Sequence, residues 1–227
     1  MPHHRLRLSL LCALAAVALS ALLVTQANAQ EEFPPPQGKG KLVVLLSGHA
    51  GPKHDKDFAK DLAALGYDIV LFDGNSMQGQ TPSALQAAIA QARQMPHALP
   101  GKVGLVGVSL GGGFALGWGA KMPDDVAVDI VWYPVTRFYL RNPDFAGHIQ
   151  VPVLMFAGES DTYHDCCLIA TARSLASGAA AAKTPFELVT YPGVDHDFIR
   201  GGTGYDASAY KDALAKTDAK LKAALTD

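Results

Sequence analysis

The five residues 107–111, GVSLG, place Ser109 on a tight turn between a predicted strand and a predicted helix. Residues 102–106, KVGLV, predict a buried strand before the turn, and residues 110–121 predict a helix after it. In that context G-x-S-x-G is typical of a nucleophile elbow, because the glycines on both sides leave room for a strained serine backbone. A Gly-rich turn that serves only close packing is the alternative interpretation.

Apolar segments alternate with helical segments on both sides of this turn. The predicted strands are 42–46, 67–72, 102–106, 126–133, 151–157 and 186–191, and the predicted helices are 53–65, 82–94, 110–121, 165–176 and 207–225. Apolar strands separated by helices predict a mostly parallel sheet of about six or more strands, covered by helices on both faces. The predicted fold class is therefore α/β.

Polar clusters directly follow the predicted strands. They are SGH at 47–49, DGN at 73–75, Ser109 itself, ESD at 159–161 and DHD at 195–197. The carboxyl ends of parallel strands meet at one edge of a sheet, where ligands of α/β proteins bind. We therefore expect the functional site at this edge.

A serine hydroxyl is a poor nucleophile until a base takes its proton, and the base needs an acceptor that orients it. In α/β-hydrolases these groups follow one another as serine, acid and histidine. His196, after the last strand, is the candidate base, and Asp161, after the fifth, is the candidate acid. Glu159 is a rival acid, and Asp161 has capping of the next helix as its alternative role. Asp195 and Asp197 are poor candidates, because an adjacent side chain seldom reaches back to the imidazole.

Backbone amides are the candidates for stabilising a developing oxyanion. One donor is expected from Leu110, directly after the serine, and the other from the loop after the first strand, with His49 as the candidate. A metal ion or organic cofactor is not expected.

Residues 41–225 resemble the dienelactone hydrolase family of small α/β-hydrolases. The resemblance rests on the Gly66-Tyr67 start of the second strand, the G-x-S-x-G-G elbow and the ending P-G-x-x-H-x-F at 192–198. It implies an α/β-hydrolase fold without a large cap domain. It also implies Ser109, Asp161 and His196 as nucleophile, acid and base, with the amides of His49 and Leu110 as oxyanion donors.

The chain departs from the namesake enzymes of that family at three places. They use a cysteine nucleophile where this chain has Ser109, and a glutamate in the first loop where it has Gly48. They grip an anionic lactone with arginines, of which Arg200 matches one. Arg200 is therefore a candidate substrate ligand, with a surface position as its alternative. Tyr133 and Trp132 are candidates for an apolar substrate pocket, with core packing as the alternative for Trp132.

The first 29 residues have the features of a secretory signal peptide. Arg5 and Arg7 form a basic start, residues 8–24 are apolar, and the small residues ANA at 27–29 form a cleavage site. An uncleaved membrane anchor is the alternative, but the apolar run is shorter than a usual span. We expect a periplasmic or secreted protein with no stable membrane association after cleavage.

The rest of the chain is expected to form a Pro-rich linker at 30–40 and one domain at 41–227. Hydrophobic residues make up 49% of the 227 residues, enough for a core. Without Arg5 and Arg7 the chain keeps 17 basic and 21 acidic residues, a net charge of −4. That balance does not suggest a nucleic-acid partner. The sequence says nothing of the oligomeric state.

Two adjacent cysteines, Cys166 and Cys167, remain in that domain. Neighbouring cysteines seldom bridge, so two buried thiols are expected. His164 and Asp165 beside them suggest a metal site only if a second ligand cluster completes it, and the sequence offers none.

The sequence thus predicts an exported serine hydrolase that cleaves a small ester or lactone through an acyl-enzyme. Two alternatives stay open. One is a binding protein that keeps the fold without turnover, and the other is an acyltransferase that passes the acyl group to an alcohol instead of water.

Overall fold

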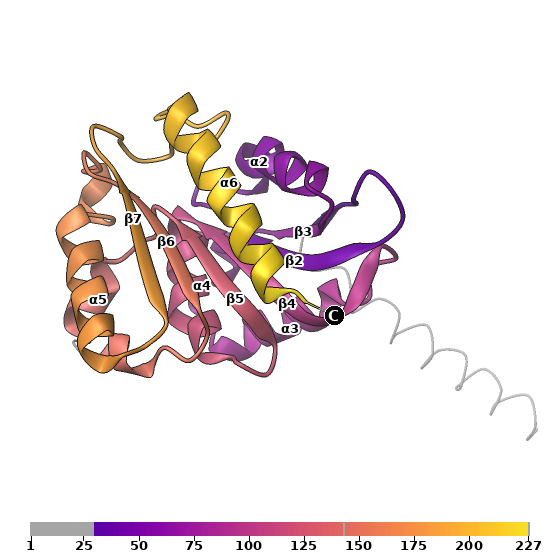
Figure 1. The fold of residues 1–227 in the computed structure, drawn as a ribbon, viewed down its shortest axis with the longest axis horizontal. Coiled ribbons are helices and arrows are strands. Elements are labelled where there is room, and N and C mark those ends of the chain that lie inside the picture. The colour runs from indigo at the N-terminus through magenta and orange to yellow at the C-terminus, as the bar shows by residue number, and fades with distance from the viewer. Residues whose placement is uncertain (1–29, 143, 227) are drawn as a thin grey trace, which may run out of the picture.

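A computed structural model describes residues 30–142 and 144–226, and Figure 1 shows its fold. A seven-stranded sheet lies at its centre in the order β1-β3-β2-β4-β5-β6-β7. Only β1 runs antiparallel to its neighbour, and the other pairs are parallel. The strands are β1 Gln30–Phe33, β2 Gly40–Leu46, β3 Asp68–Phe72, β4 Ala98–Val108, β5 Val126–Trp132, β6 Val153–Gly158 and β7 Phe186–Tyr191.

Helices cover both faces of the sheet. They are α2 Pro52–Ala64, α3 Pro82–Ala92, α4 Ser109–Trp118, α5 Ile169–Ala182 and α6 Ala207–Ala224. Apolar side chains of α2 and α6 pack on one face, and those of α3, α4 and α5 pack on the other. The two apolar layers explain why the inner strands are continuous hydrophobic runs. The predicted α/β fold class is confirmed, with no large cap among the described residues.

The expected linker at 30–40 is in part a strand, so the prediction for this segment was wrong. Gln30–Phe33 forms β1, whose residues pair with β3 from Gln30↔Phe72 to Phe33↔Ile69. The segment QEEF has no apolar run. It is an edge strand with a neighbour on one side only, and its four residues are only partly buried. The sheet therefore begins before residue 41.

The predicted signal peptide lies outside the described residues. Within residues 30–142 and 144–226, no helix is both long and apolar enough to cross a membrane.

Candidate active site

The turn after β4 holds Ser109 in a conformation that few non-glycine residues adopt. Its φ is 47°, in the left-handed region, where a side chain crowds its own backbone. A Cβ at Gly107 would lie 2.7 Å from the carbonyl oxygen of Gly111, and one at Gly111 would lie 2.3 Å from that of Leu46. Both contacts are too short for any side chain. The two glycines therefore let α4 start directly against the sheet with Ser109 at its amino terminus.

Ser109, His196 and Asp161 form a hydrogen-bonded chain across three loops. The Oγ of Ser109 lies 3.0 Å from Nε2 of His196, and Nδ1 of His196 lies 2.7 Å from Oδ2 of Asp161. All three residues are buried. The other carboxylate oxygen of Asp161 accepts a hydrogen bond from the amide of Tyr163 at 3.0 Å, which fixes the direction of the carboxylate. The structure thus brings together three side chains that the sequence spreads over 88 residues.

The rival carboxylates point elsewhere. Glu159 accepts hydrogen bonds from Arg173 at 2.7 Å and from the hydroxyl of Thr190 at 2.8 Å. Asp195 accepts from the backbone amide of His196. The preference for Asp161 as the partner of the imidazole therefore agrees with the geometry.

Two tyrosine rings contact the His196 ring. The Tyr163 ring stacks on it with centroids 4.5 Å apart and planes 5° apart, and Tyr133 meets it edge-on at 4.8 Å. Tyr163 is 44% exposed, so it separates the imidazole from solvent. Sequence reasoning missed Tyr163, because nothing in its neighbourhood distinguishes it from a surface aromatic.

The loop after β2 is fixed by a buried carboxylate. The amide of Gly48 donates to Oδ2 of Asp55 at 2.8 Å, and Asn75 donates through its side chain to the carbonyl of His49. Among the described residues, no protein acceptor takes the amides of His49 or Leu110. These are the two amides expected to serve as oxyanion donors.

Burial raises the pKa of Asp55 to about 6, and the negative charge of Asp197 contributes to this rise. The hydrogen bond from the Gly48 amide and the charge of His54 lower the pKa in part.

Asp197 lines the same cavity as Asp55. Its carboxylate accepts from Nε2 of His54 at 3.1 Å and from the backbone amide of Thr203 at 2.8 Å. Burial lowers the pKa of His54, but the hydrogen bond and charge of Asp197 outweigh burial and raise it. Sequence reasoning did not find this cluster, because His54 and Asp55 look like the polar face of α2.

Two cavities meet at Ser109, and both also contact His49 and Tyr163. The first, the His196 cavity, has a volume of about 310 Å³ and is lined by His196, Tyr133, His54, Asp55, Asp197 and Thr203. The second, the Leu110 cavity, has a volume of about 350 Å³ and is lined by Leu110, Val135, Arg137, Phe138 and Cys166. The Leu110 cavity also has Gln78 and His164 in its lining, so polar and apolar side chains line both cavities.

Of the three proposed substrate contacts, only Tyr133 lines a cavity, and it lines the His196 cavity. Trp132 is fully buried among aromatic rings that include Phe58 and Phe156, so it belongs to the core. Arg200 forms an ion pair with Asp61 of α2 on the surface. The structure therefore agrees with the alternatives given for these residues, core packing for Trp132 and a surface position for Arg200. The guanidinium of Arg200 binds Asp61 on α2, and the two residues are 139 positions apart in the sequence, so the sequence near Arg200 does not indicate this pairing.

Cys166 and Cys167 form a disulfide, so the expectation of two free thiols was also wrong. Their sulfur atoms lie within 4.8 Å of a ring nitrogen of His196, and both cysteines pack with Val135 and Leu110. The carbonyl of Cys166 accepts the amide of Thr136 at 2.8 Å. The helix expected over 165–176 begins only at Ile169, because the preceding residues form the turn that carries the disulfide.

Comparison with known proteins agrees with this geometry. The profile of the dienelactone hydrolase family matches residues 70–225. The chain therefore belongs to the dienelactone hydrolase family, and it is a hydrolase with an α/β-hydrolase fold. No curated protein matches the chain.

Two solved structures illustrate the likeness of the fold. A dienelactone hydrolase-like promiscuous phosphotriesterase from metagenomic libraries is 19% identical over 87% of this chain and 92% of its own, with a TM-score of 0.71. A thermophilic esterase from the Planctomycetes species Thermogutta terrifontis, solved with propionate bound, is 18% identical over 88% of this chain and 91% of its own, with a TM-score of 0.67.

Proposed function

We propose that this hydrolase is a serine esterase that cleaves a small carboxylic ester or lactone through an acyl-enzyme. The observation that carries the proposal is the chain of hydrogen bonds from Ser109 through His196 to Asp161. An imidazole within hydrogen-bond reach of a serine, itself oriented by a carboxylate, is the arrangement that activates a hydroxyl for nucleophilic attack.

The reaction proceeds in two halves. Ser109 Oγ attacks the ester carbonyl while His196 Nε2 takes its proton, and Asp161 stabilises the imidazolium that forms. The amides of His49 and Leu110 bind the oxyanion, and the amino terminus of α4 adds its dipole. The tetrahedral intermediate then expels the alcohol, whose oxygen receives the proton from His196. Water activated by His196 attacks the acyl-enzyme, and its proton returns to Ser109 by the same path.

The two cavities divide the substrate between them. His196 must protonate the leaving oxygen, and it lines only the first cavity, so the alcohol part belongs in the His196 cavity. The side chains of Asp197, Thr203 and His54 there favour an alcohol with further hydroxyl groups. The acyl part then belongs in the Leu110 cavity, where Leu110, Val135 and Phe138 supply apolar surface. The propionate of the Thermogutta terrifontis esterase supports a short acyl chain.

Export completes the proposal. It is supported by the basic start, apolar run and small-residue site of residues 1–29. The disulfide of Cys166 and Cys167 also supports it, because disulfides persist in oxidising compartments.

The test is hydrolysis of p-nitrophenyl acetate, butyrate and octanoate by the chain without its first 29 residues, with labelling by a fluorophosphonate. We expect turnover and labelling to vanish in Ser109→Ala and to persist in Ser83→Ala, an exposed serine on α3. A second arm compares glycerol monobutyrate with butyl butyrate, and the glycerol ester should have the higher kcat/KM. Full turnover by folded Ser109→Ala, or a label on another residue, would refute the nucleophile; preference for butyl butyrate would refute only the division of the cavities.

A further inference from the structure

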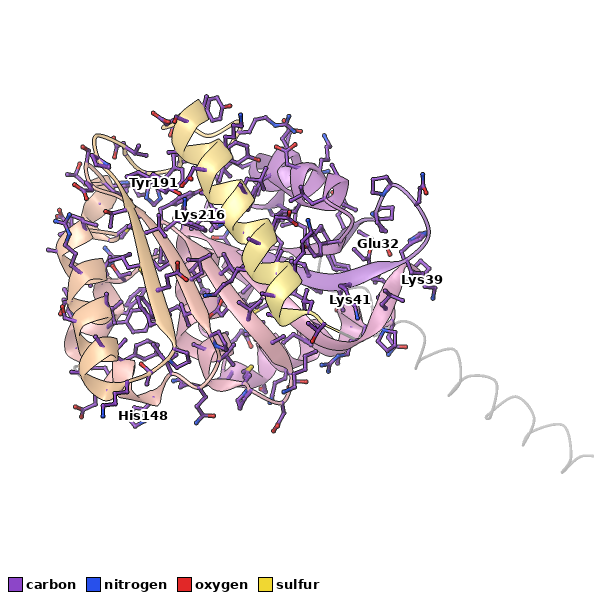
Figure 2. All side chains as sticks on the ribbon, viewed as in Figure 1. Glu32, Lys39, Lys41, His148, Tyr191 and Lys216 are labelled. Carbon is purple, nitrogen blue, oxygen red and sulfur yellow. A yellow bond between two sulfur atoms is a disulfide. The ribbon has the colours of Figure 1, made fainter. Side chains whose placement is uncertain are left out.

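A second cluster of chemically active side chains lies at the other end of the sheet from Ser109. Glu32 comes from β1, Asp68 is the first residue of β3, and His97 directly precedes β4. One oxygen of each carboxylate and one ring nitrogen of His97 all lie within 4.8 Å of one another. Glu32 is labelled in Figure 2, on the side of the molecule opposite Tyr191 at the end of β7. None of these residues lines either cavity at Ser109.

The register of the sheet puts the two carboxylates on one face. Glu32 lies opposite Val70 in the antiparallel pair of β1 and β3, and Asp68 is two residues before Val70 on β3. Side chains alternate along a strand, so Glu32 and Asp68 point to the same side. Val70 packs on the α3 side of the sheet, which is where His97 enters from the loop between α3 and β4.

Asp68 lacks the partners that a buried carboxylate needs. It is fully buried, and neither of its oxygens has a hydrogen-bond partner among the described residues. A buried carboxylate in this state is costly, and native proteins rarely leave one.

The nearby Glu32 carboxylate increases the electrostatic cost of a charged Asp68. The Glu32 carboxylate accepts from His97, with Oε1 at 3.0 Å from Nδ1 and 3.3 Å from the backbone amide. A donor oxygen of Glu32 lies within 4.8 Å of one of the buried Asp68 carboxylate, so two negative groups are close together. Two facing carboxylates need either a shared proton or a cation between them.

We propose that Glu32, Asp68 and His97 bind one divalent transition-metal ion of the zinc class. Two donors on opposite sides of one cation bound at 2.0–2.4 Å are about 4.0–4.8 Å apart, so the three donor atoms are close enough to share an ion. An imidazole nitrogen with two carboxylates favours Zn(II) over Ca(II) or Mg(II), which prefer oxygen donors alone. The His97 side chain is 42% exposed, which gives the ion a way in and leaves room for water as a further ligand.

The ion would be structural. It joins the edge strand β1 to β3 and to the loop before β4, and it neutralises the charge that burial leaves on Asp68. It takes no part in the chemistry at Ser109, so the inference stands whatever the substrate of the enzyme is.

The test is a titration of the chelator-treated protein with Zn(II), followed by calorimetry and by thermal unfolding. We expect one ion per chain and a saturable rise in Tm. Affinity should fall at least tenfold in Asp68→Asn and in His97→Ala. It should be unchanged in His148→Ala, an exposed histidine elsewhere in the chain (Figure 2).

Calorimetry keeps the result independent of how stable each variant is, and circular dichroism checks that each is folded. Absence of stoichiometric binding to the wild type would overturn the proposal, as would undiminished binding to both folded variants. Tighter binding of Ca(II) than of Zn(II) would overturn the assigned class of ion. A proton shared by Glu32 and Asp68 would show itself as higher stability of Asp68→Asn with no effect of zinc, and it would also overturn the site.

Discussion

The Asp55 carboxylate, which binds the loop after β2, should make the protein less stable as the pH rises. Asp55 is buried at the wall of the His196 cavity; one oxygen accepts from the Gly48 amide, and the other has no partner within residues 30–142 and 144–226. The perturbation is Asp55→Asn, which keeps an acceptor for the Gly48 amide and removes the titration.

The magnitude follows from the pKa. Burial raises the pKa of Asp55 from 3.8 to about 6 in the folded protein. Because the folded pKa is above the unfolded value, the favourable contribution is fully present below pH 3.8 and is lost as the pH rises through 6. A shift of this size corresponds to about 3 kcal/mol in all, of which roughly 2 kcal/mol falls between pH 4 and 7.5. Asp55→Asn should therefore gain stability relative to the wild type by that amount as the pH is raised.

The assay is urea unfolding, followed by tryptophan fluorescence, at pH values from 4 to 7.5. Asp124→Asn, at an exposed position, is the matched control and should follow the wild type. If the wild type and Asp55→Asn changed in parallel over this range, the charge on Asp55 would cost nothing and the reasoning from its burial would be refuted.

Two further predictions concern the triad and the disulfide. Asp161→Asn should lower kcat by about 10⁴-fold, because the amide favours the wrong imidazole tautomer. Glu159 contacts Arg173 and Thr190 instead, so kcat of Glu159→Gln should stay within about twofold of the wild type in the same kinetic assay. Reduction of Cys166 and Cys167 with a phosphine should change the acyl-chain preference with little change in Tm, since a bond between neighbours closes a minimal loop and constrains the unfolded chain little. In the Cys166→Ala/Cys167→Ala double variant the reductant should not change the acyl-chain preference. If the reductant also left the preference of the wild type unchanged, the assignment of the acyl part to the Leu110 cavity would be contradicted.

Sequence patterns predicted the features that depend on local sterics and chain order. The elbow requires glycines at 107 and 111 because backbone atoms fill the space of any Cβ there, so its signal is in the sequence itself. The candidate acid and the candidate base could be located because the polar residues after parallel strands meet at one edge of the sheet. Ser109, Asp161 and His196 were found in this way.

Long-range pairing decided the features that the sequence did not predict. Asp197 and His54 are 143 residues apart, and neither position indicates that the two side chains meet. Arg200 follows the site histidine closely in the sequence, but Asp61 on α2 binds it at the surface. The strand β1 has too weak an apolar pattern to be found without β3 beside it.

Asp55 and Asp68 show how differently one fold treats two buried carboxylates. Burial raises the pKa of each to about 6, so each opposes folding at neutral pH. A charged acceptor binds the Gly48 amide more strongly than a neutral one. The buried charge on Asp55 therefore has a structural effect, because it fixes the loop that carries His49. Asp68 holds no backbone group in this way. The cation proposed between Asp68, Glu32 and His97 would balance its charge, so the same physical cost indicates a fixed loop at one end of the sheet and a cation site at the other.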